Sequence, residues 1–128
     1  WQHVLEPLSG YLLLGLKLYD NPKSFYGSWN FGPNTSEFED VQNVASKIIK
    51  NMKKGTIKIS ANPDNQHEAN LLKLNCDKAS KLLKWEPRWS IEKTIEETAK
   101  WYSSFLEGKD VSKVSLSQIN AYFDGELN

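Results

Sequence analysis

Sulfur and imidazole side chains are scarce in this sequence. Among 128 residues there is one cysteine, Cys76, and there are two histidines, His3 and His67. A single cysteine excludes an internal disulfide framework and is typical of a reducing compartment, so we expect a cytoplasmic protein. These three residues show none of the ligand spacings of a zinc site, and we therefore expect no metal.

The sequence has no excess of charge of either sign and no long hydrophobic run. Sixteen Lys and Arg residues balance sixteen Asp and Glu residues, so no nucleic-acid partner is expected, because polyanion binding depends on excess basic residues. The longest apolar run, residues 11–16, falls far short of the roughly 18 residues that would predict a membrane span. The hydrophobic share of 39% excludes a disordered chain but is low for a globular one. We expect apolar faces that a partner covers.

Catalytic motifs are also missing. The sequence has no Gly-rich phosphate loop and no nucleophile elbow, and its Ser-rich end has no nearby histidine. Tyr19 and Lys23 have the Tyr-x-x-x-Lys spacing of a dehydrogenase acid/base pair, but Pro22 interrupts the helical turn that such a pair requires. We interpret this spacing as coincidence and predict no catalytic residue in the chain itself.

Apolar spacing and capping residues predict a domain with more helix than strand. Short strands are expected at 28–31, 56–60 and 71–74, because these segments alternate or follow turn signals. The predicted class is mixed α and β, with one partial domain over 1–128 and a helical tail over about 109–128. Helices are expected from Glu6-Pro7 to Asn21-Pro22, from a capping box at 36–39 to 53–55, over 75–83, over 91–107 after Ser90, and from a second capping box at 115–118 through Phe123.

A Pro- and Asn-rich loop at 61–68 holds the best candidate site. His67 and Glu68 are adjacent there, and such a pair can bind a nucleotide, because the carboxylate accepts from ribose hydroxyls and the imidazole donates to phosphate. The alternative is a solvated loop in which both side chains cap local backbone. Other candidates are interpreted structurally. We interpret a lysine cluster at 47–54 as a solvent-exposed helix face, and Trp85, Trp89, Trp101 and His3 as packing residues.

Several segments, taken in order, resemble the C-terminal part of the extended short-chain dehydrogenase/reductase family of nucleotide-sugar enzymes. They are residues 1–12 (WQHVLEPLSGYL), 29–33 (WNFGP), 67–69, 72–74, 78–79, 83–89 (LKWEPRW) and 98–102 (TAKWY). The resemblance covers nearly all of the chain and is weakest beyond residue 108. It implies a C-terminal substrate-binding lobe whose Rossmann half is absent.

The resemblance implies a function as well. It points to a lyase that uses NAD to convert a nucleotide sugar such as CDP-glucose to a 4-keto-6-deoxy sugar with loss of water, for polysaccharide biosynthesis. NAD and the catalytic residues would belong to the upstream half, so this chain would bind substrate without being catalytic by itself. Glu68 occupies the place of an acid that clamps ribose in the family. No arginine precedes it, which leaves His67 and Asn65 as donors.

Two further expectations follow. In the family, the segment near 29–31 joins the Rossmann sheet, and an edge strand without its sheet invites pairing with another chain, so we expect self-association. Trp1 is not an initiator residue, which favours a piece of a longer protein. The alternatives are another sugar-nucleotide dehydratase or epimerase, and a stand-alone interaction domain derived from one.

Overall fold

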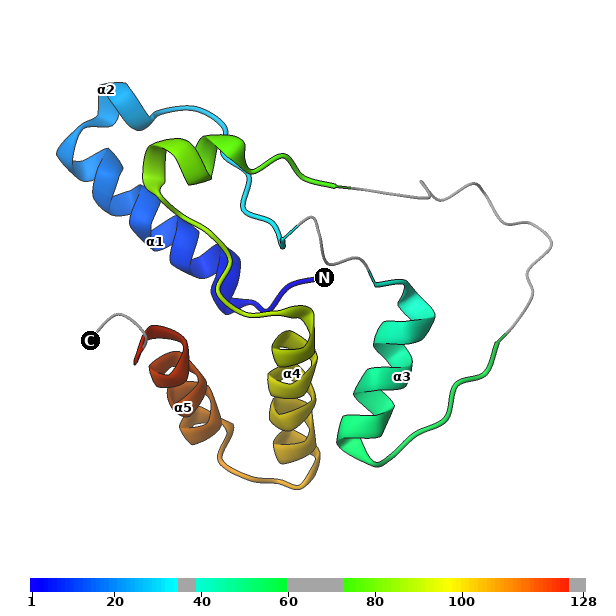
Figure 1. Ribbon diagram of the computed structural model, residues 1–128. Coiled ribbons are helices and arrows are strands. Elements are labelled where there is room, and N and C mark those ends of the chain that lie inside the picture. Colours follow the sequence, from blue (N-terminus) through cyan, green and yellow to red (C-terminus); the bar gives the residue numbers. More distant parts are fainter. Residues whose placement is uncertain (35–38, 60–72, 125–128) are drawn as a thin grey trace.

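The computed structural model describes residues 1–34, 39–59 and 73–124, and within these ranges the protein is built from helices (Figure 1). The elements are α1 (Leu5–Asp20), α2 (Pro22–Phe25), α3 (Val41–Met52), the π-helical turn η1 (Ala79–Leu83), α4 (Ile91–Leu106) and α5 (Val111–Phe123). No helix in these ranges has both the length and the apolar character that a bilayer span requires.

The expected strands are wrong wherever the structure describes them. Residues 28–31, 56–59 and 73–74 form no strand, and Ser60, Leu71 and Leu72 lie outside the described residues. A strand requires a neighbour with which to exchange backbone hydrogen bonds. Here the Phe31 carbonyl instead accepts from the Gln2 side-chain amide at 3.1 Å. The sequence pattern predicted an extended backbone but could not supply the partner strand.

Helix α1 begins and ends where the sequence predicts. Its last turn is closed by the Asn21 amide, which donates to the Lys17 carbonyl at 2.9 Å. The Asn21 side chain accepts from the Ser24 amide at 3.3 Å and so starts α2, which has Pro22 in its first turn. The prediction that Asn21-Pro22 ends the first helix is confirmed.

Aspartate residues cap the starts of α3 and α5. Asp40 accepts from the Asn43 amide at 2.7 Å and begins α3, whereas residues 35–38 lie outside the described ranges. Asp110 accepts from the Ser112 amide at 3.0 Å and begins α5, so the capping box at 115–118 is wrong. Ser115 lies inside α5, where its hydroxyl donates to the Val111 carbonyl at 2.9 Å, a bond that helical Ser residues commonly form.

Helix α4 follows the prediction more closely. Ser90 accepts from the Lys93 amide at 3.2 Å, and the chain turns at Gly108, whose φ of +71° is a conformation that glycine adopts without strain. Part of its outer surface is apolar, because Tyr102 and Phe105 are 54% and 57% exposed. Leu82, in η1, is 55% exposed as well.

Among the residues that the structure describes, buried apolar side chains pack in two clusters. The first joins α1, η1 and the extended segment before α3, and contains Phe31, Ala79, Leu83 and Trp85. The second lies between α3 and α4 and contains Val44, Ile91 and Ile95, with Ile48 packed against it. Figure 1 shows the same division, with α3 beside α4 and with η1 beside α1.

Candidate functional site: a buried carboxylate beside an apolar groove

A buried carboxylate ties α1 to the connector that precedes α4. Glu6, in the first turn of α1, is 1% exposed. Its oxygens accept from the Arg88 amide at 3.0 and 3.1 Å and from the Trp89 amide at 2.8 Å. Backbone donors of this kind stabilise a carboxylate that has lost its water shell. Glu6 therefore fixes where the connector crosses α1.

Helix α5 joins the same cluster through Tyr122. Its hydroxyl donates to Glu6 Oε2 at 2.6 Å and lies 3.1 Å from the Ser9 hydroxyl. Burial, together with the hydrogen bond to Glu6, raises the pKa of Tyr122, so the phenol stays protonated and remains a donor. Trp85 completes the set, because its indole N–H donates to Ser9 Oγ at 2.9 Å.

Arg88 holds the end of α5. Its guanidinium donates to the Tyr122 carbonyl at 3.1 Å and lies 5.1 and 5.3 Å from the ring centroids of Tyr122 and Phe123. A cation near the last carbonyls of a helix opposes the negative end of the helix dipole. We call Glu6, Ser9, Trp85, Arg88 and Tyr122 the Glu6 cluster.

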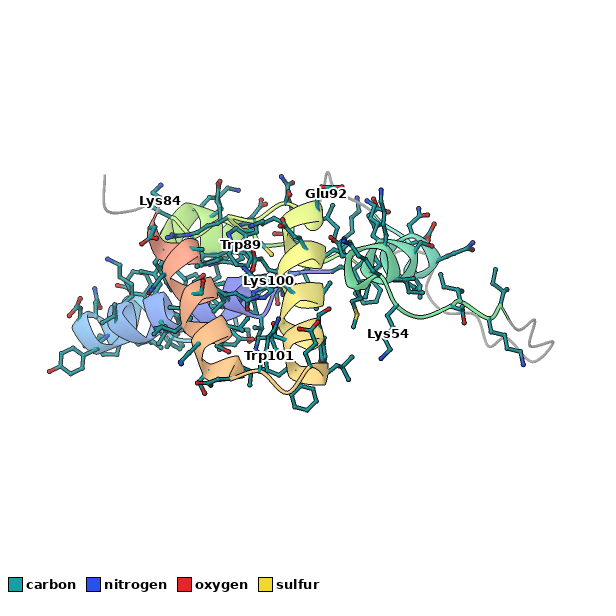
Figure 2. All side chains as sticks on the ribbon, turned by 90° about the horizontal axis from the view of Figure 1, so that it is seen from below. Lys54, Lys84, Trp89, Glu92, Lys100 and Trp101 are labelled. Carbon is teal, nitrogen blue, oxygen red and sulfur yellow. The ribbon has the colours of Figure 1, made fainter. Side chains whose placement is uncertain are left out.

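An apolar groove of about 520 Å³ runs beside this cluster, between the start of α1, α4 and α5. It is lined by Gln2, His3, Val4, Leu5, Leu8, Thr98, Trp101, Tyr102, Ser115, Gln118 and Ile119. Figure 2 shows Trp101 near the lower ends of α4 and α5, and Trp89 closer to the middle of the molecule. A mostly apolar wall with a few polar groups is the usual composition of a binding site.

His3 is a titratable side chain in the groove wall. It is 6% exposed, its Nδ1 accepts from the Leu5 amide at 3.3 Å, and its ring lies 4.8 Å from that of Trp89. Burial lowers the pKa of His3, although the charges of Glu97 and Glu6 oppose this shift. Because Nδ1 is an acceptor, the neutral imidazole carries its proton on Nε2. The interpretation of His3 as a packing residue is confirmed.

Glu97 and Gln118 hold α4 and α5 together behind the groove. The Gln118 side-chain amide donates to the Glu97 carbonyl at 2.8 Å and to its carboxylate at 3.1 Å. Lys93 pairs with the same carboxylate at 2.7 Å. Burial opposes ionisation of Glu97, but the hydrogen bonds from Lys93 and Gln118 outweigh it, so its pKa is lowered. The carboxylate therefore stays charged at neutral pH.

Gln2 contributes an acceptor whose hydrogen-bonding capacity is unused. Its amide nitrogen is committed to the Phe31 carbonyl, and its Oε1 is buried without a hydrogen-bond partner among the described residues. A buried acceptor left unpaired is costly, since it has lost water and gained nothing. Gln2 lines the groove, where a donor from a bound group would satisfy it.

The predicted substrate-binding residues Asn65, His67 and Glu68 lie outside the described residues, so their proposed roles remain predictions. The lysine cluster is partly accounted for, because Lys47 pairs with Glu39 and, at 3.2 Å, with Glu92. Among the described residues, no group of three or more His, Cys, Asp or Glu side chains is arranged to hold a metal.

Sequence reasoning missed the Glu6 cluster. The sequence indicates Glu6 only as part of a helix start, and it assigns no role to Ser9, Arg88 or Tyr122. One signal was available, because Glu6 and Ser9 are polar residues in the first turns of an otherwise apolar helix. A charged residue at such a position is expected to have a buried partner. The partners themselves come from residues 85–122 and could not be identified by spacing.

Comparison with known proteins places the chain next to one characterised enzyme. No protein-family model matches the sequence. The chain is 35% identical over 122 residues to CDP-glucose 4,6-dehydratase of Salmonella typhimurium, a match that covers 95% of this chain and 34% of that enzyme. The matched region is the C-terminal part of the enzyme. The chain thus spans about a third of the length of this relative.

Proposed function

We propose that this chain is the substrate-binding C-terminal part of a CDP-glucose 4,6-dehydratase. The observation that carries the proposal is the similarity to that enzyme, which runs through 95% of the chain without being confined to one motif. The segments at 1–12 and 83–89, on which the family resemblance rests, contain Glu6, Ser9, Trp85 and Arg88, and hydrogen bonds join the two segments in the structure. A shared framework of this kind supports a shared placement of the substrate loop.

The reaction that we propose for the larger enzyme converts CDP-glucose to CDP-4-keto-6-deoxyglucose and water. A hydride leaves C4, water is eliminated across C5 and C6, and the hydride returns to C6, so the reaction has no net oxidation. NAD, when bound, accepts and returns that hydride. This chain has no Gly-rich turn, and its described residues form no strand that could position one, so we assign NAD and the catalytic residues to the rest of the enzyme.

Within this chain, substrate binding is assigned to Asn65, His67 and Glu68. Glu68 would accept hydrogen bonds from the ribose hydroxyls, while Asn65 and His67 would donate to phosphate. The described framework contributes by fixing η1 and the connector against α1, through the bonds of Glu6 to the Arg88 and Trp89 amides. A cytoplasmic location and a role in supplying deoxysugars for surface polysaccharide belong to the same proposal.

The first test is the reading frame of the gene upstream of Trp1. We expect it to continue through a Tyr-x-x-x-Lys pair to a Gly-rich loop, and we expect the encoded protein to release water from CDP-glucose, as followed by mass spectrometry. UDP-glucose and GDP-mannose are the comparison substrates. A frame that contains both motifs but encodes a protein inactive on all three nucleotide sugars would contradict the proposal.

The second test addresses the substrate loop. In the larger protein, Glu68→Ala is expected to raise KM for CDP-glucose about tenfold, because it removes hydrogen bonds to a bound ligand from a charged group. Glu107→Ala is the matched control, since Glu107 is exposed and 57% of its side-chain surface is accessible. An unchanged KM in the Glu68 variant would remove the ribose assignment.

Self-association of this chain by itself is also proposed. Residues 29–31 form no strand, so we no longer attribute the association to an unpaired strand edge. The outer side of α1 exposes large apolar side chains, and we expect association through these instead. We expect association that grows with concentration in sedimentation velocity, without a fixed stoichiometry. A single monomeric species at millimolar concentration would contradict the proposed self-association. The same exposed side chains favour the alternative of a stand-alone interaction domain, which the reading frame distinguishes.

A further inference from the structure

Helix α1 turns an apolar face to the solvent. Its exposed positions recur at the three- and four-residue spacing of one helix side, and all but one are apolar. From Val4 to Tyr19 the exposed large side chains are Val4 (61%), Leu8 (44%), Tyr11 (58%), Leu12 (66%), Leu16 (66%) and Tyr19 (89%). We call this set, together with Gly15, the outer face of α1.

Two polar residues in the first turns of α1, Glu6 and Ser9, face the opposite way. Glu6 is buried in its cluster, and Ser9 is bonded to Trp85 and to the Glu6 carbonyl. A helix at the surface of a complete globular protein has the reverse arrangement, with polar residues outward. A helix whose inner side is occupied and whose outer side is apolar has the character of a helix buried between two layers.

The apolar surface continues beyond the helix on both flanks. Val4 and Leu8 also line the groove against α4 and α5, where Gln2 has its unpaired acceptor. Leu12 and Leu16 line a second depression of about 460 Å³ against the connector and Phe123. The surface therefore follows the whole length of α1, along the edge of the molecule that α1 and α2 form in Figure 1.

A glycine in the middle of this face is unexplained by the chain's own packing. A Cβ built on Gly15 meets no atom within 4 Å, whereas a Cβ on Gly10 would lie 2.2 Å from the Phe31 ring. Glycine inside a helix is unfavourable relative to alanine, so its presence on an open face requires a reason. A notch between Tyr11, Leu12 and Tyr19 is suited to a close approach from outside the chain.

We infer that the outer face of α1 is the surface on which the remainder of the larger enzyme packs, and that the Gly15 notch receives one of its side chains or its backbone. The inference rests on the proposed function. Two thirds of the length of the Salmonella relative lies outside the match, which is enough chain to form a covering layer. A second copy of this chain is the competing occupant, and the experiment separates the two.

We expect Gly15→Ala to change Tm in opposite directions in the 128-residue chain and in the larger protein. In the 128-residue chain, Gly15→Ala raises Tm by about 3 °C, since alanine favours the helix and meets nothing. In the larger protein, the same methyl group fills the notch and lowers Tm by about 3 °C. Ser117→Ala, at an exposed position inside α5, is the matched control and is expected to raise Tm slightly in both.

A second variant tests the face outside the notch. Leu12→Gln leaves Tm of the 128-residue chain within about 2 °C of the wild type, because Leu12 is 66% exposed there. In the larger protein it lowers Tm by at least about 5 °C, since an amide is then buried without a partner. Both variants are measured by thermal denaturation, with sedimentation equilibrium of the 128-residue chain.

Three results overturn the inference. The first is that Gly15→Ala stabilises both proteins and Leu12→Gln harms neither, which leaves the outer face in solvent. The second is a dimer of fixed stoichiometry that Leu12→Gln dissociates, which makes a second copy the occupant. The third is a reading frame that encodes no further domain. If Gly15→Ala lowers Tm of the larger protein while raising that of the 128-residue chain, but the larger protein does not dehydrate CDP-glucose, the interface is supported and the proposed function is refuted.

Discussion

The hydroxyl of Tyr122 donates a 2.6 Å hydrogen bond to the carboxylate of Glu6 across 116 residues of sequence. It links the first helix to the last one, and both side chains are almost completely buried. Glu6 also accepts from two backbone amides of the connector, so one carboxylate determines the relative positions of three segments. Removing this hydrogen bond therefore tests how strongly α5 is held against α1.

We expect Tyr122→Phe to lower the free energy of unfolding by about 1.5–3 kcal/mol, the usual contribution of a buried hydrogen bond to a charged group. The ring is kept, so its packing against Trp89 at 5.2 Å is preserved. Urea denaturation measures the change. Tyr102→Phe is the control, because Tyr102 is 54% exposed, and equal effects of the two substitutions would show that α5 is not docked through Glu6.

Gly10→Ala is expected to destabilise the chain even though alanine is the better helix former. The added methyl group would lie 2.2 Å from the Phe31 ring, so the ring or the helix must move. Overpacking of this kind costs about 1–3 kcal/mol, which exceeds the gain of about 1 kcal/mol in helix propensity. The measurement is chemical denaturation.

A double-mutant cycle provides the control for Gly10. Combined with Phe31→Leu, which opens space at the contact, Gly10→Ala should cost less than it does in the wild type. Additive effects of the two substitutions would mean that the loss does not arise from this contact.

Stability should fall on mild acidification because of His3. Its pKa is lowered in the folded chain from the usual histidine value of 6.5, so below about pH 6.5 the unfolded chain binds a proton that the folded chain does not. The stability associated with the neutral imidazole is thus complete above pH 6.5 and declines as the pH falls toward the folded pKa.

His3→Gln isolates this contribution. The lowered pKa of Glu97 also makes stability fall with acid, but only below the usual glutamate value of 4.5, and it does so in both the wild type and the variant. The difference in unfolding free energy between wild type and variant should therefore change between pH 7.5 and 5.5. A difference that stays constant over this range would contradict the proposed burial of a neutral His3.

The attachment of α3 should depend on its apolar side chains rather than on its ion pairs. Ile95 is 2% exposed in the cluster between α3 and α4, and Ile95→Ala is expected to cost about 2–5 kcal/mol. Lys47 bridges Glu39 and Glu92 at the surface, where water and salt screen the pairs, so Lys47→Met should leave stability nearly unchanged. Denaturation at low and high salt tests both, and a large salt-dependent loss in the lysine variant would reverse this ranking.

Local signals in the sequence were sufficient for most helices. Pro7, Asn21 and Ser90 act through their own backbone neighbours, so their positions could be predicted without knowing the fold. The caps of α3 and α5 were missed, because Asp40 and Asp110 compete with nearby Ser-x-x-Glu/Gln patterns, and only the entry direction of the chain decides between them.

Features that depend on distant residues could not be predicted. The strand at 28–31 had the right composition, but pairing requires a neighbour that spacing does not reveal. The Glu6 carboxylate is bonded to residues 82 to 116 positions away in the sequence, and nothing near Glu6 indicates Arg88 or Tyr122. The candidate site at His67 and Glu68 rests on local residue chemistry, and its ribose and phosphate roles, with Asn65, rest on family resemblance. All three residues lie outside the described ranges, so the site remains a prediction.

Because the core is divided into two clusters, different parts of the chain are expected to open with different free energies. Helix α3 packs on α4 through one cluster, whereas α1, η1 and the segment around Phe31 share the other. Such an arrangement favours independent cooperative units, each with its own opening free energy. Native-state hydrogen exchange should show the amides of α3 opening in a smaller event than those of α1, so that one end of the molecule loosens while the Glu6 end remains closed.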